Sequence, residues 1–446
     1  MYMKLSTMLF INSYMSKIFV KFTDRDGNSR AWPSDYSEYT DIIERDTFVF
    51  WTGNRKEEHN FHFVEYSQLQ ENLPYNVIIQ GCESNPNLFR EHRYIIDEIV
   101  NSKSNEMWLD QLKQDSENGL VHYYINQAKE KHIVLDRDKF WWSLFHLVEA
   151  LGCKNHPQNI HLITGASQIN PEVKFIQEFT GISVHTVQEC DNFLKGYFYD
   201  YTPQGYSIKS NPEYELFVQN TTNSINKLET RKYQALTYNR VPRPMRSLLL
   251  AELERTDKLD QTLYSWGNEI KNIFNENDME PYGKIYENLK EGVTKWYNRP
   301  PVYIKDEVGK ISLAQNQADW INLYHPQECN FKIVTETCYN DLAFITEKSM
   351  KAFVSMLPFI MLGPAFNVEV LRDNGYRVYD NWIDHSYDKH RNFENRWYLF
   401  TSELNRLYNI SKEEWASMRK EMLPDMLYNL EIAKSRTVSN CLHIFK

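Results

Sequence analysis

Apolar residues in this chain of 446 residues occur in short runs that alternate with segments of helical periodicity. Runs rich in β-forming residues cover 47–51, 76–81, 132–136, 159–165 and 181–187 in the first half. Near-continuous apolar strands separated by helices are typical of a parallel sheet that helices cover on both faces. Residues 141–151 repeat apolar positions at helical spacing, so the first half is predicted to be α/β.

The same alternation starts again in the second half of the chain. Predicted strands cover 233–240, 301–305, 331–337, 342–346, 358–363 and 376–380. The polar stretch 206–231 between the halves is predicted to be an interdomain connection. Near the C-terminus, Ser411 and Glu414 have the spacing of a capping box, which predicts a helix start, and a bend is expected at Pro424.

These patterns predict two Rossmann-like α/β domains that face each other across a cleft, with a C-terminal helix packing back. The expected domains are 1–205 and 232–410, with a linker region at 206–231 and the terminal helix at 411–446. A chain of this length exceeds one ordinary hydrophobic core, which also favours two domains. Open parallel sheets bind ligands at the carboxyl ends of their strands, so the functional site is expected in the cleft.

Charge and cysteine content narrow the class of partner. The chain has 60 acidic and 50 basic residues, and a formal charge of -10 disfavours a surface built to coat nucleic acid. Its six cysteines are scattered and interpreted as free thiols, as in a reducing compartment. The N-terminus lacks the apolar core of a signal peptide, and no apolar window could cross a bilayer. We therefore expect a cytoplasmic protein without a membrane segment.

Positive charges stand at the start of a predicted helix, where the helix dipole disfavours cations. The apolar stripe of this helix consists of Met350, Phe353, Val354 and Leu357. The helix should therefore begin near Thr346, its expected N-cap, with Lys348 in the first turn and Lys351 one turn on. Helix N-termini bind phosphate through backbone amides, so Lys348 is interpreted as a phosphate ligand. The simpler alternative is a solvated lysine that pairs with Glu347 or another neighbouring acid.

A second junction between a strand and a helix shows the same pattern. Arg240, Arg243 and Arg246 recur every three residues after the predicted strand 233–240, and Pro244 suits the first turn of the next helix. Two such junctions at the carboxyl ends of strands in one domain suggest a shared anion. A diphosphate fits, because arginine binds it through two hydrogen bonds and lysine neutralises it.

Glu347 is a candidate ligand for the ribose of a nucleotide. It lies beside Lys348 and could accept hydrogen bonds from the two ribose hydroxyls, as an acidic residue does in dinucleotide sites. The alternative is an ion pair between Glu347 and Lys351, one helical turn away.

Four motifs of the second half carry a resemblance to a known family. These are F-x-I-V-T-E-T, F-I-T-E-K-x-x-K-A, P-F-I-M-L-G-P, and L-R-D-N-G-Y with D-x-S-Y-D. Together they resemble the donor domain of GT-B glycosyltransferases over about residues 233–388. The pattern is similar to the α-1,3-fucosyltransferase signature. It is also similar to bacteriophage and bacterial glycosyltransferase-like proteins that carry Y-N-R-x-x-R-x-x-R upstream.

The resemblance implies roles for several residues. In fucosyltransferases the glutamate of T-E-K contacts the ribose and the lysine contacts a phosphate, which are Glu347 and Lys348 here. An upstream arginine binds the diphosphate, matched by Arg240 with Arg243 and Arg246 as alternatives. The predicted donor-binding residues are Arg240, Arg243, Arg246, Glu336, Thr346, Glu347, Lys348 and Lys351. Glu336 stands where the family has E-N-S, although this chain has E-T-C. The family inverts at the anomeric carbon without a bound metal, so no cofactor is expected beside the nucleotide-sugar co-substrate.

The acceptor side needs a carboxylate or histidine that takes the acceptor proton. Glu83, Asp136 and Asp138 follow predicted strands and are the catalytic candidates, with helix caps or turn formers as the alternative roles. The triplet 136–138 also has the D-x-D form that holds a divalent metal in GT-A glycosyltransferases. The same triplet recurs at 24–26 before a glycine, and a GT-A site would leave the basic helix starts unexplained.

The sequence therefore predicts a glycosyltransferase that moves a sugar from a nucleotide-diphosphate donor to an acceptor hydroxyl of a glycan, a protein or modified DNA. One alternative is a phage-type DNA glycosyltransferase acting on hydroxymethylated pyrimidines in the host cytoplasm. The basic segment 227–246 could then contact phosphates of a duplex. Another alternative is a non-catalytic nucleotide-sugar binder or structural protein that shares the fold.

Overall fold

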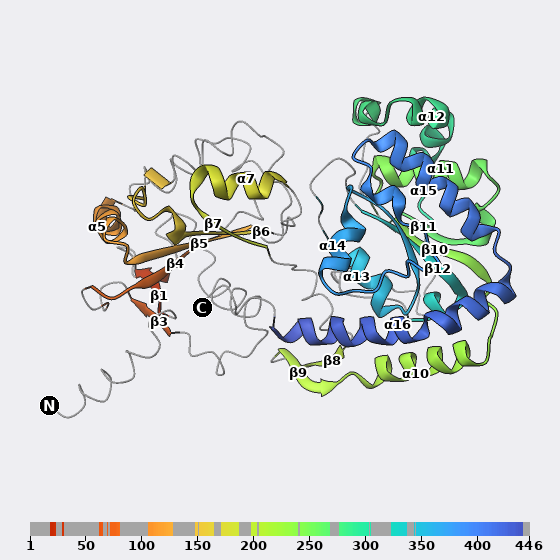
Figure 1. Ribbon diagram of the computed structural model, residues 1–446, viewed down its shortest axis with the longest axis horizontal. Coiled ribbons are helices and arrows are strands. Elements are labelled where there is room, and N and C mark those ends of the chain that lie inside the picture. The colour runs from red at the N-terminus through yellow and green to blue at the C-terminus, as the bar shows by residue number, and fades with distance from the viewer. Residues whose placement is uncertain are drawn as a thin grey trace. The chain divides into compact units, whose positions relative to one another are not determined.

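The structure is a computed structural model, and it describes part of the chain. The described residues are 18–23, 29–30, 62–65, 69, 72–80, 106–127, 148–149, 151–164, 171–186, 198–202, 205–239, 241–267, 276–302, 304, 323–336, 343 and 345–439. The chain divides into two compact units. The first consists of Met1–Glu189 with Val438–Lys446, and the second is Cys190–Thr437. Figure 1 shows the ribbon of each unit.

The first unit is built on a seven-stranded sheet in the order β2-β1-β4-β5-β6-β7, with β3 paired to β1. Its strands are β1 (Ile18–Thr23), β2 (Ser29–Arg30), β3 (His62–Glu65), β4 (Tyr75–Gln80), β5 (Val121–Gln127), β6 (Ile160–Thr164) and β7 (Ser183–Thr186). All pairs are parallel except β1 with β2. The helices α5 (Glu106–Glu117) and α7 (Pro171–Thr180) flank this sheet.

Buried side chains on alternating positions of β4, β5 and β6 explain why these runs form central strands. Val77, Tyr123 and Leu162 are fully buried. The hydroxyl of Tyr123 lies 2.8 Å from the hydroxyl of Ser116 on α5, so this buried polar group has a hydrogen-bond partner. The helix α5 is thereby joined to the middle of the sheet by a polar contact as well as by apolar packing.

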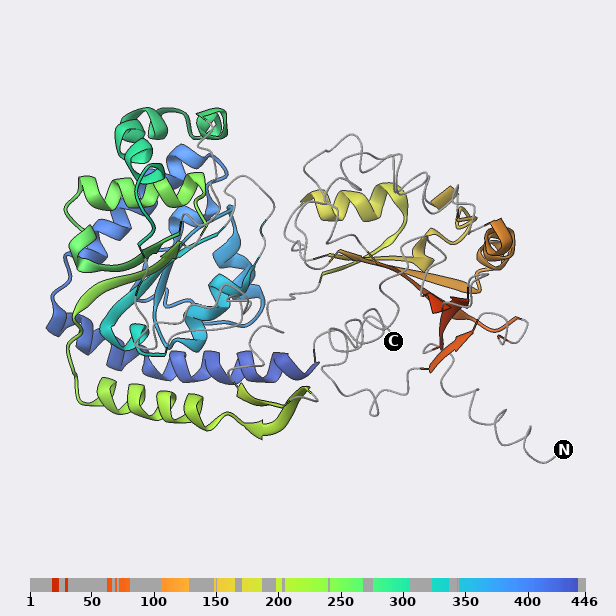
Figure 2. The ribbon, with the colours of Figure 1, turned by 180° about the vertical axis from the view of Figure 1, so that it is seen from behind.

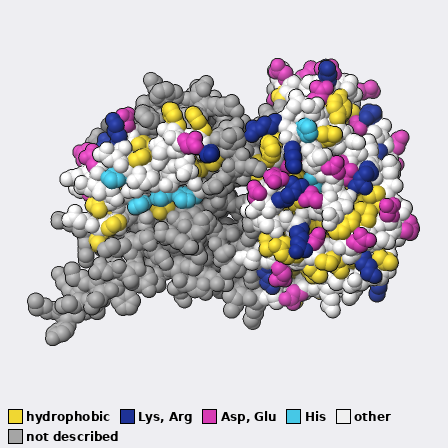
Figure 3. All heavy atoms as spheres, in the orientation of Figure 1, with side chains coloured by type: hydrophobic (Ala, Val, Ile, Leu, Met, Phe, Trp, Pro, Cys, Tyr) yellow, Lys and Arg dark blue, Asp and Glu magenta, His cyan; other side chains and the backbone are white. Residues whose placement is uncertain are grey.

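Three histidines form a hydrogen-bonded row across β5, β6 and β7. Nδ1 of His122 lies 3.0 Å from Nε2 of His161, and Nδ1 of His161 lies 2.9 Å from Nε2 of His185. The rings are stacked, and Tyr124 stacks on His161 at 4.4 Å between centroids. Figure 3 shows histidine side chains side by side on this unit. Burial and the two neighbouring imidazoles lower the pKa of His161 to about 3, so His161 is neutral at pH 7.

The second unit contains a four-stranded parallel sheet in the order β11-β10-β12-β13. The strands are β10 (Tyr233–Asn239), β11 (Thr262–Trp266), β12 (Cys329–Thr335) and β13 (Phe359–Leu362). The helices are α10 (Pro212–Asn226), α11 (Pro244–Arg255), α12 (Gly283–Tyr297), α13 (Glu347–Val354), α14 (Asn367–Asp373), α15 (Phe393–Tyr408) and α16 (Lys412–Ser439). An antiparallel pair, β8 (Tyr199–Thr202) and β9 (Gly205–Ser210), precedes α10.

All seven residues of β12 are buried, because helices cover this strand on both faces. Phe331 stacks on Trp415 of α16 and meets Tyr408 of α15 edge to face. Lys332, the next residue, faces the opposite side of the sheet, where α13 packs. Figures 1 and 2 show α11 and α12 on one side of this sheet and α13 on the other. The predicted α/β class is confirmed for both units.

The segment 206–231, expected to be a linker, instead contains β9 and α10 and belongs to the second unit. Pro212 lies in the first turn of α10, and the side chain of Asn211 caps it. The polar composition of this stretch belongs to the outer face of the helix, while Tyr214 is buried and donates a hydrogen bond to the carbonyl of Val354. Figures 1 and 2 show α10 running alongside α16.

The residues 376–380 were expected to form a strand, but they form no strand and lie outside the sheet. Asn429 of α16 explains the difference. Its side chain accepts a hydrogen bond from the backbone N–H of Arg377 and donates one to the carbonyl of the same residue, so it replaces a neighbouring strand. Tyr379 then turns the chain with a φ of 67°.

The C-terminal helix begins as predicted. The hydroxyl of Ser411 accepts a hydrogen bond from the backbone N–H of Glu414 at 3.1 Å. Pro424 lies inside α16. In the described part of the chain, no helix has the length and apolar character needed to cross a membrane. Of the six cysteines, Cys153 and Cys329 are buried free thiols and the other four lie outside the described residues.

The start of α14 is capped by a carboxylate from a distant part of the sequence. Phe366, at the N-cap position, has a left-handed backbone and supplies no side-chain cap. The Oδ2 atom of Asp388 instead accepts hydrogen bonds from the N–H groups of Val368 and Glu369 at 3.0 and 3.3 Å. Burial raises the pKa of Asp388 to about 7, against the opposing effect of these two hydrogen bonds.

The raised pKa of Asp388 predicts that the stability of the folded protein depends on pH. The folded state holds the proton more tightly than the unfolded chain, so the stability that protonation contributes is lost as the pH rises from about 4 to about 7. Asp388→Asn keeps an oxygen acceptor but cannot ionise. We expect the free energy of unfolding of the wild type to fall by roughly 1 to 3 kcal/mol relative to Asp388→Asn over that range, in urea titrations at several pH values.

Asp388→Ala is the matched variant that removes the acceptor as well. It should be about 1 kcal/mol less stable than Asp388→Asn at every pH. Parallel pH profiles for the wild type and Asp388→Asn would show that the pKa of this carboxyl is the same in the folded and unfolded states, which contradicts the raised pKa.

Candidate functional site

The best-defined candidate site surrounds the first turn of α13 and brings together five of the predicted residues. These are Glu336, Thr346, Glu347, Lys348 and Lys351; together with Lys332 and Ser349, which were not predicted, we call them the α13 cluster. Glu336 directly follows β12, and α13 leads into β13, the neighbouring strand. The cluster therefore lies at the carboxyl edge of the sheet, where parallel sheets bind ligands.

Thr346 is the N-cap of α13, as predicted. Its hydroxyl accepts a hydrogen bond from the backbone N–H of Lys348 at 3.2 Å. The same hydroxyl donates to Oε2 of Glu336 at 2.7 Å. One side chain thus caps the helix and joins it to the end of β12.

Glu336 is almost fully buried and holds the start of α13 through both carboxylate oxygens. Its Oε1 atom accepts a hydrogen bond from the hydroxyl of Ser349 at 2.7 Å, in addition to the bond from Thr346. Gly363 leaves the space that this carboxylate needs, since a Cβ there would lie 3.1 Å from its Cβ and Cγ atoms. Both oxygens are engaged by protein hydroxyls, so Glu336 positions the helix start.

Glu347 and Lys348 form an ion pair between neighbouring side chains. Nζ of Lys348 lies 2.8 Å from Oε1 of Glu347, and the two side chains are 26% and 20% exposed. Burial alone would raise the pKa of Glu347, but the charges of Lys348 and Lys351 and the hydrogen bond from Lys348 lower it overall. The pairing matches the alternative that needs no ligand, and it holds both side chains at the helix start.

Lys332 is a buried cation that the sequence analysis did not single out. Only 3% of the residue is exposed, and its Nζ atom has no hydrogen-bond partner among the described residues. It lies 5.6 Å from the centre of the Tyr238 ring. Burial, then the charge of Lys351, lowers the pKa of Lys332 to about 7, while Glu347 and Glu336 act in the opposite direction. Its position in the apolar run F-K-I-V-T was the available signal.

The second predicted junction is described only in part. Arg243 is exposed at the N-cap position of α11. Arg246 is buried, and its Nη1 atom donates to the carbonyl of Val241 at 2.7 Å. Both arginines lie close enough to Tyr297 of α12 to lower its pKa, although burial dominates and raises that pKa to about 12. The expected position of Pro244 at the start of α11 is confirmed.

Four predicted site residues lie outside the described part of the chain. They are Glu83, Asp136, Asp138 and Arg240. The base that would accept the acceptor proton and the shared anion between Arg240 and Lys348 therefore stay predictions. Within the described residues, no group of three or more His, Cys, Asp or Glu side chains could hold a metal ion.

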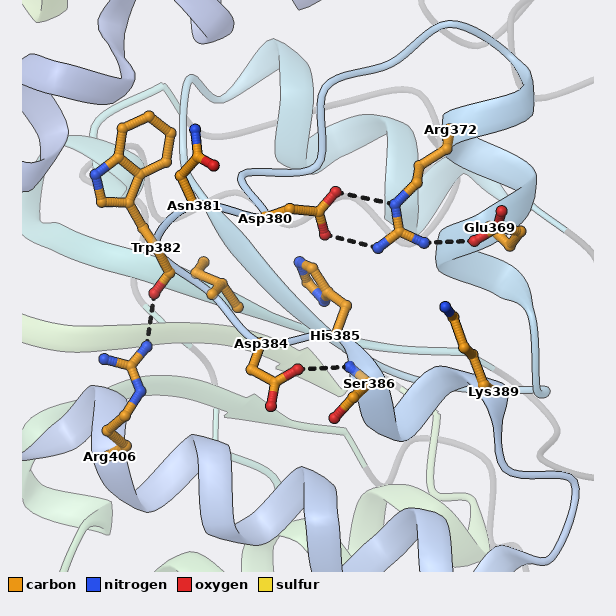
Figure 4. Close-up of a pocket in the computed structure, with 11 residues that line it drawn as sticks. Glu369, Arg372, Asp380, Asn381, Trp382, Asp384, His385, Ser386, Lys389 and Arg406 are labelled. Atoms are coloured by element: carbon orange, nitrogen blue, oxygen red, sulfur yellow. Dashed lines mark hydrogen bonds and ion pairs between the residues drawn. The ribbon is translucent and has the colours of Figure 1, made fainter.

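A polar pocket of about 730 Å³ lies between α14, the segment 380–386 and α15 (Figure 4). Arg372 binds both oxygens of Asp380, at 3.0 and 2.6 Å, and also pairs with Glu369. Arg406 donates to the carbonyl of Trp382. The two guanidinium groups are engaged by protein acceptors, and none of the predicted donor-binding residues lines this pocket.

His385 is a buried residue of the pocket lining. Its Nε2 atom lies 2.8 Å from the carbonyl of Val378, and Nδ1 lies 3.1 Å from the hydroxyl of Tyr387. The carbonyl can only accept, so Nε2 carries the proton and Nδ1 accepts from Tyr387. Burial lowers the pKa of His385 to about 4, which keeps it neutral at pH 7.

Comparisons with known proteins do not assign this chain to a family. No family model matches it, and no curated protein matches it. One solved structure, a Candida albicans trehalose-6-phosphate phosphatase N-terminal domain, is similar at 9% identity and a TM-score of 0.29. The match covers 94% of this chain and 92% of that chain. Similarity at this level supports no conclusion about fold or function.

Removal of the Thr346 hydroxyl should destabilise the second unit. Thr346→Val keeps the shape of the side chain but loses the cap and one hydrogen bond to buried Glu336. We expect a loss of about 1 to 3 kcal/mol in the free energy of unfolding, measured by urea titration. Thr346→Ser keeps the hydroxyl and should lose less than about 1 kcal/mol. Equal losses for the two variants would mean that the hydroxyl is unimportant.

The buried Lys332 predicts that stability rises with pH above neutrality. Its pKa is about 7 in the folded protein and roughly 10.4 in an unfolded chain, so unfolding takes up a proton between these values. The free energy of unfolding of the wild type should therefore increase relative to Lys332→Met by up to about 1.4 kcal/mol per pH unit from pH 7 to 10. A constant difference between the two proteins over this range would contradict the lowered pKa.

Proposed function

We propose that the second unit binds a nucleotide-diphosphate sugar at the α13 cluster and that the protein is a glycosyltransferase. In the reaction, the acceptor oxygen forms a bond to the anomeric carbon while the bond from that carbon to the diphosphate oxygen breaks. The acceptor hydroxyl gives its proton to a general base, and the nucleoside diphosphate leaves with the bonding electron pair. The GT-B arrangement of the two units is part of this proposal.

The observation that carries the proposal is the concentration of positive charge at the start of α13. Lys348 lies in the first turn, and Lys351 follows one turn on. The dipole of α13 disfavours cations at this end by a few tenths to about 1 kcal/mol. A bound diphosphate reverses the sign of that interaction, because the same dipole and the same lysines then attract it.

The pairing of Glu347 with Lys348 fits a donor site that is organised before the ligand arrives. Both side chains are mostly buried, so neither has to be ordered from a freely rotating state when the donor binds. Lys348 would turn from the carboxylate toward a phosphate, and Glu347 would then accept hydrogen bonds from the ribose hydroxyls. The resemblance to fucosyltransferase motifs assigns the same two roles.

Lys348→Ala should weaken the binding of nucleotide sugars. A hydrogen bond between charged groups contributes about 1.5 to 3 kcal/mol, so we expect an increase in Kd of about 10-fold to 100-fold. Isothermal titration calorimetry with UDP-glucose, GDP-fucose and related donors measures this change. Lys284→Ala is the matched control, because Lys284 is an exposed lysine of α12 on a different part of the unit. Its Kd should equal that of the wild type.

Assays of sugar release and of thermal stability separate an enzyme from a binding protein. An enzyme should release sugar from its donor, and faster when a suitable glycan, protein or hydroxymethylated DNA acceptor is present, whereas a binder should only gain thermal stability. If no nucleotide sugar binds, or if Lys348→Ala and Lys284→Ala behave alike, the α13 cluster is not a donor site.

A further inference from the structure

Within the described part of the chain, the charged groups around Lys332 leave its ammonium without a hydrogen-bond acceptor. The Glu336 oxygens accept from Thr346 and Ser349, and the Glu347 carboxylate accepts from Lys348. An ammonium group has three N–H donors, and a buried charge without hydrogen bonds is strongly disfavoured. The geometry therefore favours the neutral amine at Lys332 when the α13 cluster is arranged as described.

The groups that face Lys332 come from each element packed against it. Glu336 follows on β12, while Glu347, Lys348 and Lys351 come from α13. From β10, Tyr238 presents its ring, and the hydroxyl of this tyrosine lies 3.2 Å from Nδ1 of His325 in the 3-10 helix η9 (His325–Glu328). The charges at the start of α13 therefore act on Lys332, although this residue is buried.

We propose that Lys332 is a proton-accepting group of the α13 cluster, so that a diphosphate binds there together with one proton taken up from solvent by the Lys332 amine. This inference rests on the proposed donor site. A bound dianion neutralises Lys348 and Lys351, which removes the repulsion that these cations exert on an ammonium at Lys332. It also draws Lys348 away from Glu347, so the negative charge of this carboxylate is no longer balanced by Lys348 and favours a charged Lys332.

The pKa of Lys332 also supports the proposal, because it lies close to physiological pH. Burial and the neighbouring cations lower it to about 7, so a modest change of charge nearby alters its protonation at physiological pH. By linkage, a ligand that raises this pKa binds more tightly when the proton is available. The affinity for the donor should therefore fall by up to about tenfold per pH unit as the pH rises above 7.

The test is calorimetry of the full chain with UDP-glucose and GDP-fucose at pH 7.5. Their diphosphates are diesters and lack the phosphate ionisation near pH 6 that would release protons of its own. Titrations in two buffers with different ionisation enthalpies give the number of protons taken up. We expect between about half a proton and one proton for the wild type and none for Lys332→Met, which keeps the length and apolar part of the side chain.

Each outcome decides between the two proposals. If a nucleotide sugar binds with equal heat in both buffers, or if proton uptake persists in Lys332→Met, the role of Lys332 is refuted and the donor site stands. If neither nucleotide sugar binds, the donor site and the proton coupling are both refuted. The wild-type comparison needs no variant, so it remains decisive if Lys332→Met fails to fold, and Lys332→Gln then replaces it as the non-titrating variant.

Discussion

The buried carboxylate of Glu336 joins the first turn of α13 to the end of β12. It lies beside the N-terminus of this helix and accepts hydrogen bonds from the hydroxyls of Thr346 and Ser349. Because both oxygens are engaged, the carboxylate fixes the direction and the depth of α13 relative to the sheet. The positions of Lys348 and Lys351 follow from that arrangement.

Among the described residues, the α13 cluster contains more lysines than carboxylates. Lys332, Lys348 and Lys351 share the region with Glu336 and Glu347, and Glu336 is engaged by hydroxyls. A protein core usually avoids such an excess because a buried charge without a partner is costly. Loss of a proton from Lys332 removes this excess, since Lys348 and Lys351 then match the two carboxylates in number. In the proposed donor site, the proton returns when the bound anion completes the charge balance.

Apolar periodicity predicted much of the second unit. The strands 233–240, 331–337 and 358–363 correspond to β10, β12 and β13, and the start of α13 at Thr346 is confirmed through its cap. These elements were predictable because one local rule, burial or capping, determines each of them.

Several exceptions depend on contacts between distant residues, and others depend on local composition. Residues 376–380 look like a strand, yet Asn429 replaces the neighbouring strand. The strands β5 and β11 were not predicted, because polar and aromatic residues interrupt their apolar runs. Within the site, the role of Glu336 and the burial of Lys332 depend on how α13 packs on the sheet, which sequence spacing does not encode.

The histidine row of the first unit has a property that no single imidazole has. His161 uses both ring nitrogens for its neighbours, and a neutral ring carries one N–H, so it donates toward His122 or toward His185 but never toward both. The three rings must therefore adopt the same hydrogen-bond direction. A change of tautomer at one end reverses the polarity of the whole row. These strands thus carry a collective dipole with two orientations across the face of the sheet.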